Sequence, residues 1–357
     1  ARVLVVDDMA LYRMVIGRAI AAVEGLEVVG QAADGEAALQ SIRRLRPDLV
    51  TLDVEMPGCT GLDVLRELAT WPASQRPQVV VFSSQSVEGA KETLAALRLG
   101  AADFVLKPVA ARGCVAIEED LIPCLQRLAG QVPAAAPSVG RPQKPPPRPA
   151  TPPLGRSSAR RRRLLVIASS TGGPPALERA LGSLPADFAA PILVVQHMPA
   201  LFTRTMSEML DKRCAIAVAE AREGVPLRPG QALVAPGDYH LSLAVDGSRS
   251  VVRLDQGERV FGLRPAADCL LRSLAAGGGG LSPADLVVAV FTGMGCDGQA
   301  GIQALQAAGA GCRVLTQTAE SCVVYGMPRA VDEAGLSHAH FTPDDFGDCL
   351  RSDTWAW

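Results

Sequence analysis

Short apolar runs recur along the chain, and each is followed by polar residues or glycine. These runs cover residues 3–6, 49–52, 79–82, 164–168, 191–196 and 285–291. They are continuous in apolar or β-branched residues rather than alternating, which is typical of strands buried on both faces of a parallel sheet. The pattern therefore predicts α/β architecture in both the first and the second part of the chain.

Charged residues follow the strands of the first part. Asp7 and Asp8 come directly after the first run, Asp53 follows the second, and Lys107-Pro108 follows another. Open α/β sheets bind ligands at the carboxyl ends of their strands. Three carboxylates crowded there repel one another unless a cation joins them, and Mg²⁺ suits carboxylates combined with phosphate oxygens. An acid pair alone more often starts a helix, but the full set predicts a site that holds a metal ion and accepts a phosphoryl group.

Residues 1–128 resemble the receiver domain of two-component response regulators. The resemblance implies a flavodoxin-like fold, with a parallel sheet of strand order 2-1-3-4-5, and implies that Asp53 accepts the phosphoryl group. It also implies that Asp7 and Asp8 hold Mg²⁺, together with Asp53 and the backbone carbonyl of Glu55.

Three further roles follow from the same resemblance. Lys107 would pair with the phosphoryl oxygens, and Ser83 would donate its hydroxyl to them. Phe104 occupies the switch-aromatic position of the family, although the sequence fits an ordinary core phenylalanine equally well. The segment Cys59-Thr60-Gly61 departs from the family, which usually has an acidic residue before the glycine. This loop lies beyond the metal ligands, so the expectation of phosphorylation stands.

Composition narrows the remaining possibilities. At 357 residues the chain is long enough for two domains that each bury a core. It contains no run of 18 apolar residues and no signal-peptide pattern, so we expect no direct membrane insertion. The nine cysteines lack a CxxC pair, which favours a reduced, cytoplasmic setting over a disulfide framework.

Residues 131–163 form a segment of different composition. They include nine prolines and eight Lys or Arg residues, with no acidic residue. This composition predicts an extended linker between domains at residues 1–130 and 164–357. The segment Pro145–Pro149 also fits a polyproline II ligand, but a spacer is the favoured interpretation.

The basic linker raises the question of a nucleic-acid partner. Its arginines at 160–163 could contact nucleic acid or anionic lipid. Subtracting its eight positive charges from the net charge of −2 leaves −10 for the two domains. A nucleic-acid-binding output domain is usually basic, so we expect no nucleic-acid partner. A receiver-controlled transcription factor is disfavoured for this reason and by the 194 residues that follow Arg163.

The second part of the chain carries candidate catalytic residues. The strand at 164–168 leads into Ser169-Ser170-Thr171-Gly172-Gly173, and Pro174-Pro175 then opens a helix. A serine on such a turn is exposed, and helix N-terminal amides near Thr171 can stabilise an oxyanion. A turn of this kind can equally bind a phosphate or simply make a tight corner.

A histidine and an aspartate follow two other predicted strands. His197 follows residues 191–196, and it alone among the four histidines ends a core strand. Asp297 lies in the glycine-rich loop after residues 285–291, where an aspartate often merely caps a helix. Because all three residues lie at the carboxyl ends of parallel strands, one crevice can hold Ser170, His197 and Asp297 as nucleophile, base and orienting acid.

Four motifs resemble the signatures of the chemotaxis protein-glutamate methylesterase family. They are Ser170–Gly173, Val195–Pro199, Thr292–Gly298 and Cys322–Pro328. The family joins a receiver to a doubly wound α/β catalytic domain, which we expect to carry a β-hairpin insertion. The α/β-hydrolases are excluded because their triad runs Ser, acid, His along the chain. Before the nucleophile the family usually has Gly-Ala where this chain has Ala168-Ser169, but alignment on Thr171-Gly172-Gly173 selects Ser170.

The resemblance implies a phosphorylation-activated carboxylic ester hydrolase. It would hydrolyse glutamyl γ-methyl esters on methyl-accepting chemoreceptors and deamidate glutamines there, thereby supporting sensory adaptation. The backbone amide of Met294 would be a second oxyanion donor. A histidine kinase would supply the phosphoryl group, Mg²⁺ would serve only the receiver, and the esterase would need no cofactor. The alternative that remains is a catalytically silent adaptor that binds receptors through the same fold.

Overall fold

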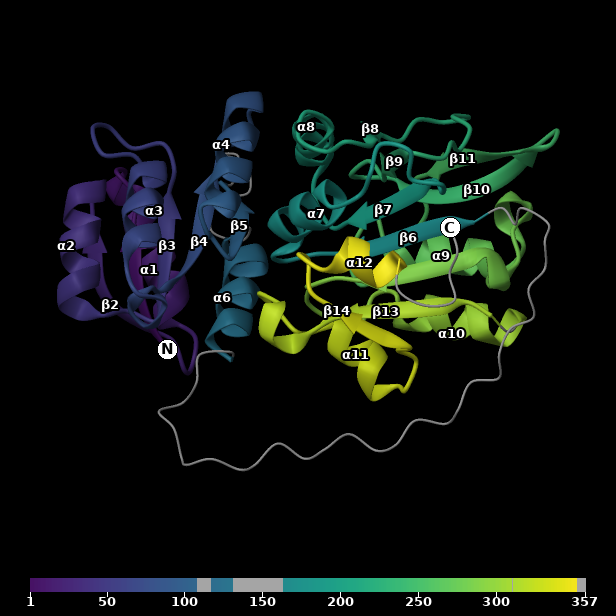
Figure 1. The fold of residues 1–357 in the computed structure, drawn as a ribbon. Coiled ribbons are helices and arrows are strands. Elements are labelled where there is room, and N and C mark those ends of the chain that lie inside the picture. Colours follow the sequence, from purple (N-terminus) through teal and green to yellow (C-terminus); the bar gives the residue numbers. More distant parts are fainter. Residues whose placement is uncertain (108–116, 131–162, 310, 352–357) are drawn as a thin grey trace.

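The computed structural model describes residues 1–107, 117–130, 163–309 and 311–351. Two α/β domains lie side by side, with the first coloured purple to blue in Figure 1 and the second teal to yellow. Pro108 and all of the predicted linker except Arg163 lie outside the described residues. Within the described residues, no helix is both long enough and apolar enough to cross a membrane.

The first domain is built on a parallel sheet with strand order β2-β1-β3-β4-β5, as predicted. Its strands are β1 (Arg2–Val6), β2 (Glu27–Ala32), β3 (Leu49–Asp53), β4 (Gln78–Ser83) and β5 (Asp103–Leu106). Its helices are α1 (Ala10–Ala21), α2 (Gly35–Leu45), α3 (Gly61–Thr70), α4 (Val87–Arg98), the π-helix η2 (Ile117–Leu121), α6 (Ile122–Ala129) and the 3₁₀ turn η1 (Ala73–Gln75).

Local sequence explains where several of these helices begin. The side chains of Asp34 and Ser86 accept hydrogen bonds from backbone amides in the first turns of α2 and α4. Thr60 and Asp63 form a reciprocal capping box at α3. The unusual segment before Gly61 therefore still starts its helix in a standard way.

The second domain has a parallel sheet of order β14-β13-β12-β6-β7-β9-β8. Its strands are β6 (Leu164–Ser169), β7 (Ile192–Gln196), β8 (Ala217–Glu220), β9 (Gln231–Val234), β12 (Leu286–Val290), β13 (Arg313–Gln317) and β14 (Ala339–Phe341). The chain leaves the central strand β6 towards β7 and later returns on its other side with β12. This change of direction is the switch point at which doubly wound sheets bind ligands.

A β-hairpin is inserted in this domain, as predicted. Strands β10 (His240–Asp246) and β11 (Arg249–Asp255) pair antiparallel as a separate sheet. The helices are α7 (Gly173–Gly182), α8 (Ala200–Asp211), α9 (Ala267–Ala275), α10 (Gln299–Ala308), α11 (Met327–Glu333) and α12 (Phe346–Arg351), with 3₁₀ turns η3 (Gly278–Gly280), η4 (Pro283–Asp285) and η5 (Ala319–Ser321).

Helices cover both faces of the second sheet, which explains its uninterrupted apolar strands. Leu177 of α7 and Phe202 of α8 belong to the core on one face. Leu270 of α9 and Ile302 of α10 belong to the core on the other. The polar residues at the carboxyl ends of the strands are therefore held on a rigid scaffold.

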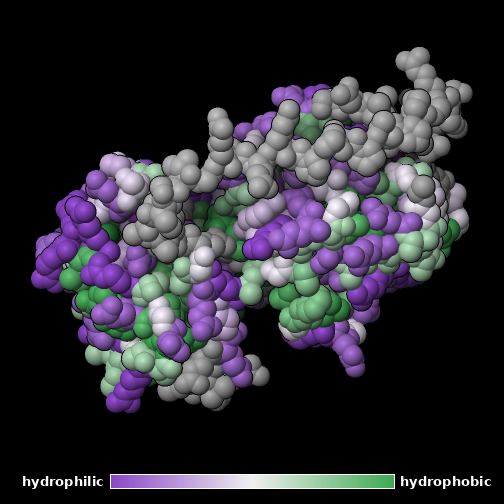
Figure 2. All heavy atoms as spheres, turned by 90° about the horizontal axis from the view of Figure 1, so that it is seen from below, coloured by the Kyte–Doolittle hydropathy of each residue, from purple (hydrophilic) through white to green (hydrophobic). Residues whose placement is uncertain are grey.

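The two domains contact each other through the α4 and β5 side of the first. Helix α4 packs against α7 and α8 (Figure 1). Phe104 stacks on Phe202 with ring centroids 4.7 Å apart, and Arg98 forms a 2.9 Å ion pair with Glu178. The view from below shows two lobes with a notch between them (Figure 2).

Candidate active site and phosphoacceptor site

Ser170 lies in the turn between β6 and α7, and the amide of Gly173 donates a 2.8 Å hydrogen bond to its carbonyl. Gly172 has φ +77°, and a Cβ there would lie 2.5 Å from Cβ of Val323. Only glycine combines this conformation with so close a neighbour. The predicted prolines occupy the first positions of α7, so the turn leads directly into a helix N-terminus.

The neighbouring serine has a different environment. Ser169 is fully buried, and its hydroxyl donates a 2.7 Å hydrogen bond to Oε1 of Gln196. Nε2 of Gln196 in turn donates to the carbonyl of Ser170 at 2.9 Å. Ser170, by contrast, lines the cleft that also contains His197. The arrangement therefore favours Ser170 as the reactive serine.

His197 and Asp297 lie together, as the sequence predicted. Nε2 of His197 is 2.7 Å from Oδ2 of Asp297, and the histidine side chain is only 5% exposed. Asp297 also accepts hydrogen bonds from the amides of Ala267 at 2.6 Å and Asp268 at 2.9 Å. Burial alone would raise the pKa of Asp297, but the hydrogen bond and charge of His197 and the two amides outweigh it and lower the pKa.

This geometry assigns the two imidazole nitrogens different tasks. A carboxylate that accepts from Nε2 holds the tautomer in which Nδ1 carries the free lone pair. Nδ1 is buried and has no hydrogen-bond partner among the described residues. Ser170 and His197 line the same cleft without a hydrogen bond between them in the described structure, and such bonds commonly tighten only when substrate is bound.

The predicted oxyanion donors flank the serine. The Thr171 amide follows Ser170 at the start of α7, and Met294 lies in the loop after β12, where it is 41% exposed. A Cβ at Gly293 would lie 2.8 Å from Cβ of Ser170, so this loop approaches the serine closely. Neither amide donates a hydrogen bond within the described part of the chain, so neither is committed to another described acceptor.

The acidic residues of the first domain also meet. Carboxylate oxygens of Asp7, Asp8 and Asp53 lie within 4.8 Å of one another. Nζ of Lys107 is 2.5 Å from Oδ2 of Asp53 and 3.5 Å from Oδ2 of Asp7. Burial raises the pKa of Asp53 to about 6, with Asp7 adding to the rise and Lys107 opposing it.

This acidic cluster fits a hard divalent cation. Oδ2 of Asp7 is buried and has no hydrogen-bond partner among the described residues. An all-oxygen donor set with surplus negative charge is what Mg²⁺ prefers. Glu55 lies two residues after Asp53, and its backbone amide donates a 3.1 Å hydrogen bond to Oδ1 of Asp53.

Two predicted receiver residues face elsewhere. The hydroxyl of Ser83 is hydrogen-bonded to the carbonyl of Gly89 and to the hydroxyl of Thr93, so it must leave them to reach a phosphoryl group. Phe104 packs on Phe202 of the second domain, so it is not simply part of the receiver core. Both residues lie at β4 and β5, next to the domain contact.

Comparisons with known proteins agree with this architecture. The family model for the CheB methylesterase matches residues 165–350, and that for the response regulator receiver domain matches residues 3–117. A protein-glutamate methylesterase/protein-glutamine glutaminase of Myxococcus xanthus is 43% identical over 94% of this chain and 93% of its own length. The chain belongs to the CheB methylesterase family. A homologue with the same name from Symbiobacterium thermophilum is 41% identical over 94% of the chain and 92% of its own length.

A solved structure agrees with the fold of the second domain. The crystal structure of the Thermotoga maritima CheB methylesterase catalytic domain is 35% identical, with a TM-score of 0.50. The match covers 53% of this chain and 97% of the Thermotoga maritima chain. The predicted methylesterase fold is thus confirmed for this CheB-family protein.

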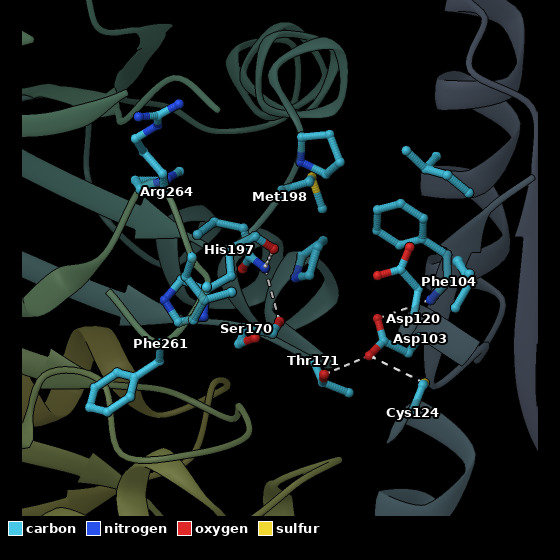
Figure 3. A pocket seen from close by; sticks show the side chains of 18 of the residues that line it. Asp103, Phe104, Asp120, Cys124, Ser170, Thr171, His197, Met198, Phe261 and Arg264 are labelled. Carbon is cyan, nitrogen blue, oxygen red and sulfur yellow. Dashed lines mark hydrogen bonds between the residues drawn. The ribbon is translucent and has the colours of Figure 1, made fainter. Parts of the chain in front are cut away.

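One residue next to the serine turn was not predicted from sequence. Asp103 of the receiver accepts a 2.6 Å hydrogen bond from the hydroxyl of Thr171, across a cleft of about 820 Å³ between the domains (Figure 3). Burial raises the pKa of Asp103, although the hydrogen bond from Thr171 and the charge of Arg127 oppose the rise. Asp103 belongs to none of the recognisable motifs, and its partner lies 68 residues away, so no sequence signal marks it.

Proposed function

We propose that this chain is a protein-glutamate methylesterase and protein-glutamine glutaminase that acts on chemoreceptors under the control of Asp53 phosphorylation. The observation that carries the proposal is the shared cleft of Ser170 and His197, with Asp297 2.7 Å from the imidazole. Family membership supports the reaction class. The proposed domains are the receiver at 1–130, the linker at 131–163 and the esterase at 164–357.

The chemistry follows the geometry of the three side chains. Oγ of Ser170 attacks the γ-carbonyl carbon while Nδ1 of His197 takes the serine proton. The amides of Thr171 and Met294 stabilise the oxyanion. His197 then protonates the leaving group, which gives methanol from an ester or ammonia from an amide.

The second half of the reaction restores the serine. Water attacks the glutamyl acyl-enzyme, His197 accepts a proton from this water, and the same proton returns to Ser170. Asp297 keeps its charge throughout and stabilises the imidazolium. No cofactor is needed for these steps.

The receiver supplies the control. Asp53 accepts a phosphoryl group from a histidine kinase; a bound Mg²⁺, held by Asp7, Asp8, Asp53 and the carbonyl of Glu55, would neutralise the incoming phosphoryl charge. Lys107 and Ser83 would then bind the phosphoryl oxygens. The eight described cysteines form no disulfide with one another, which supports the proposed reducing, cytoplasmic setting.

The position of the receiver suggests how this control operates. Asp103 and Phe104 lie across the cleft from Ser170 and His197, and Asp103 bonds the residue that follows the proposed nucleophile (Figure 3). A receptor segment cannot occupy the space that the receiver fills. We therefore expect the unphosphorylated receiver to inhibit the esterase and its phosphorylation to weaken the contact between the domains.

The direct test is methanol release from membranes that contain methylated receptors. The full-length protein should release methanol, and acetyl phosphate with Mg²⁺ should raise the rate. Asp53→Asn should keep the basal rate and lose the stimulation. Receptor binding without methanol release would instead support the silent adaptor.

A further inference from the structure

Asp268 is a buried carboxylate that the reaction described above does not use. It is 0% exposed and is the second residue of α9. Its Oδ1 accepts hydrogen bonds from the amides of Gly298 at 2.9 Å and Gly301 at 2.7 Å. These amides belong to the N-terminus of α10, and Gly298 directly follows Asp297.

Asp297 makes the reciprocal contacts. Its Oδ2 accepts from the amide of Ala267 and its Oδ1 from the amide of Asp268, both at the N-terminus of α9. Each aspartate therefore caps the helix next to the other, and each satisfies amides that a helix start leaves without partners. The two helices pack closely here, since a Cβ at Gly301 would lie 3.2 Å from Cα of Asp268.

The loop that carries Asp297 needs this support. It contains Gly295 with φ +81° and Gly298 with φ +98°, so its own sequence permits many conformations. Asp268 ties the end of this loop to α9, the helix whose amides also bind the Asp297 carboxylate. Without the Asp268 carboxylate, two buried amides lose their acceptor, and the cost of leaving them unpaired favours a shift of the loop.

We propose that Asp268 is a positioning residue of the esterase, which holds Asp297 against His197 by accepting the amides of Gly298 and Gly301. It does not contact the substrate. The inference rests on the proposed esterase function and adds to it the residue that aligns the orienting acid.

The chemistry of the site indicates that its oxygen matters more than its charge. Burial and the neighbouring charge of Asp297 raise the pKa of Asp268, whereas the amides of Gly301 and Gly298 lower it less strongly. Its other oxygen, Oδ2, faces Arg272 at 3.5 Å, and Arg272 is 52% exposed. An asparagine can keep the accepting Oδ1 and place its NH₂ group where Oδ2 lies, because the half-exposed Arg272 side chain can turn away into solvent; Asp268→Asn therefore tests geometry separately from charge.

The experiment measures methanol release by the full-length protein at saturating acetyl phosphate and Mg²⁺. Asp268→Ala should lower kcat by roughly 10- to 100-fold with KM within about twofold, because the misplaced group acts on the chemical step and not on substrate binding. Asp268→Asn should restore kcat to within about threefold of the wild type, because Oδ1 still accepts both amides. The downfield imidazole N–H proton signal of His197 should persist in Asp268→Asn and disappear in Asp268→Ala.

A matched control separates positioning from general loss of stability. Asp211 at the end of α8 also accepts a hydrogen bond from a backbone amide, that of Val218 at 2.8 Å in a partly buried setting, but it does not line the cleft. Asp211→Ala should therefore keep kcat, and thermal unfolding should establish that every variant is folded at the assay temperature.

Three results would overturn the inference. They are a folded Asp268→Ala with kcat near that of the wild type, equal losses in Asp268→Asn and Asp268→Ala, and a change confined to KM. Absence of methanol release by the wild type is a separate outcome, because it contradicts the proposed function itself.

Discussion

At the scale of single residues, two adjacent serines differ in what surrounds their hydroxyls. Ser169 is the last residue of β6 and is tied to Gln196 in the interior, whereas Ser170 lines the cleft with His197. The strand ends at Ser169, and Ser170 is the first residue of the turn to α7, so the two serines have different backbone settings. This contrast agrees with the choice of Ser170 from the motif.

The two serines are expected to give opposite results when each is replaced. Ser170→Ala should reduce kcat on the order of 10⁶-fold, as loss of a triad nucleophile does. Ser169→Ala should keep most of kcat but lower the free energy of unfolding by roughly 1–3 kcal/mol, because Oε1 of Gln196 loses its donor. Methanol release and urea denaturation measure the two effects, and equal losses of kcat would leave the nucleophile unassigned.

At the scale of elements, the β6–α7 turn depends on a glycine as much as on its serine. Gly172 combines a left-handed backbone with a neighbour, Val323, that leaves no room for a side chain. The motif Cys322–Pro328 thus has a packing function beside any chemical one. It places Val323 behind the turn and Tyr325 in a bridge with Gly293 of the Met294 loop.

Gly172→Ala should therefore lower the free energy of unfolding in two ways. A left-handed alanine costs about 1–2 kcal/mol, and the clash with Val323 adds about 1–3 kcal/mol of overpacking. Gly224→Ala is the matched control, because Gly224 has φ +75° but no atom within 4 Å of the place that a Cβ would occupy, so only the backbone cost applies. A similar shift of the urea midpoint in both variants would contradict the proposed clash.

The elements also show how far sequence could lead. Uninterrupted apolar strands predicted the parallel sheets, and the residues that follow them predicted which side chains would gather at the sheet edges. The contacts of Asp103, Gln196 and Asp268 were not predicted. The contacts of Asp103 and Asp268 depend on how domains or helices pack, because their partners lie 30 to 68 residues away in the chain. The contact of Gln196 depends on its side chain reaching the carbonyl of Ser170, which follows the neighbouring strand β6. Strand periodicity contains no information about such packing.

At the scale of the whole molecule, the contact between the two domains includes the carboxylate of Asp103, and the charged form of this carboxylate weakens the contact. Because the pKa of Asp103 is raised by burial, the docked state binds a proton more tightly than a state in which Asp103 faces water. Protonation of Asp103 therefore adds to the free energy of docking. This contribution is fully present below the pKa of an exposed aspartate and is lost as the pH rises through the raised pKa of Asp103 in the docked state. At pH values above this raised pKa the charged Asp103 therefore weakens docking.

Three proteins test this inhibition with a soluble methyl-ester substrate. Fragment 164–357 should be more active than the unphosphorylated full-length protein, and acetyl phosphate should raise only the full-length rate. Asp103→Asn should lower the basal full-length rate severalfold, since the neutral amide avoids the cost of desolvating a charged carboxylate at the domain contact. If the fragment is no faster than the whole protein, the receiver does not inhibit the esterase.

Strand β5 links the phosphoacceptor site physically to the contact between the domains. Asp103 and Phe104 at its start contact the esterase, and Lys107 directly after its end contacts Asp53. Coupling free energies are reciprocal. If a phosphoryl group on Asp53 weakens docking by a given factor, docking must make the phosphoryl-transfer equilibrium at Asp53 less favourable by the same factor. The esterase domain is then a regulator of its own receiver, and a receptor that draws the domains apart would also help the protein to retain its phosphoryl group.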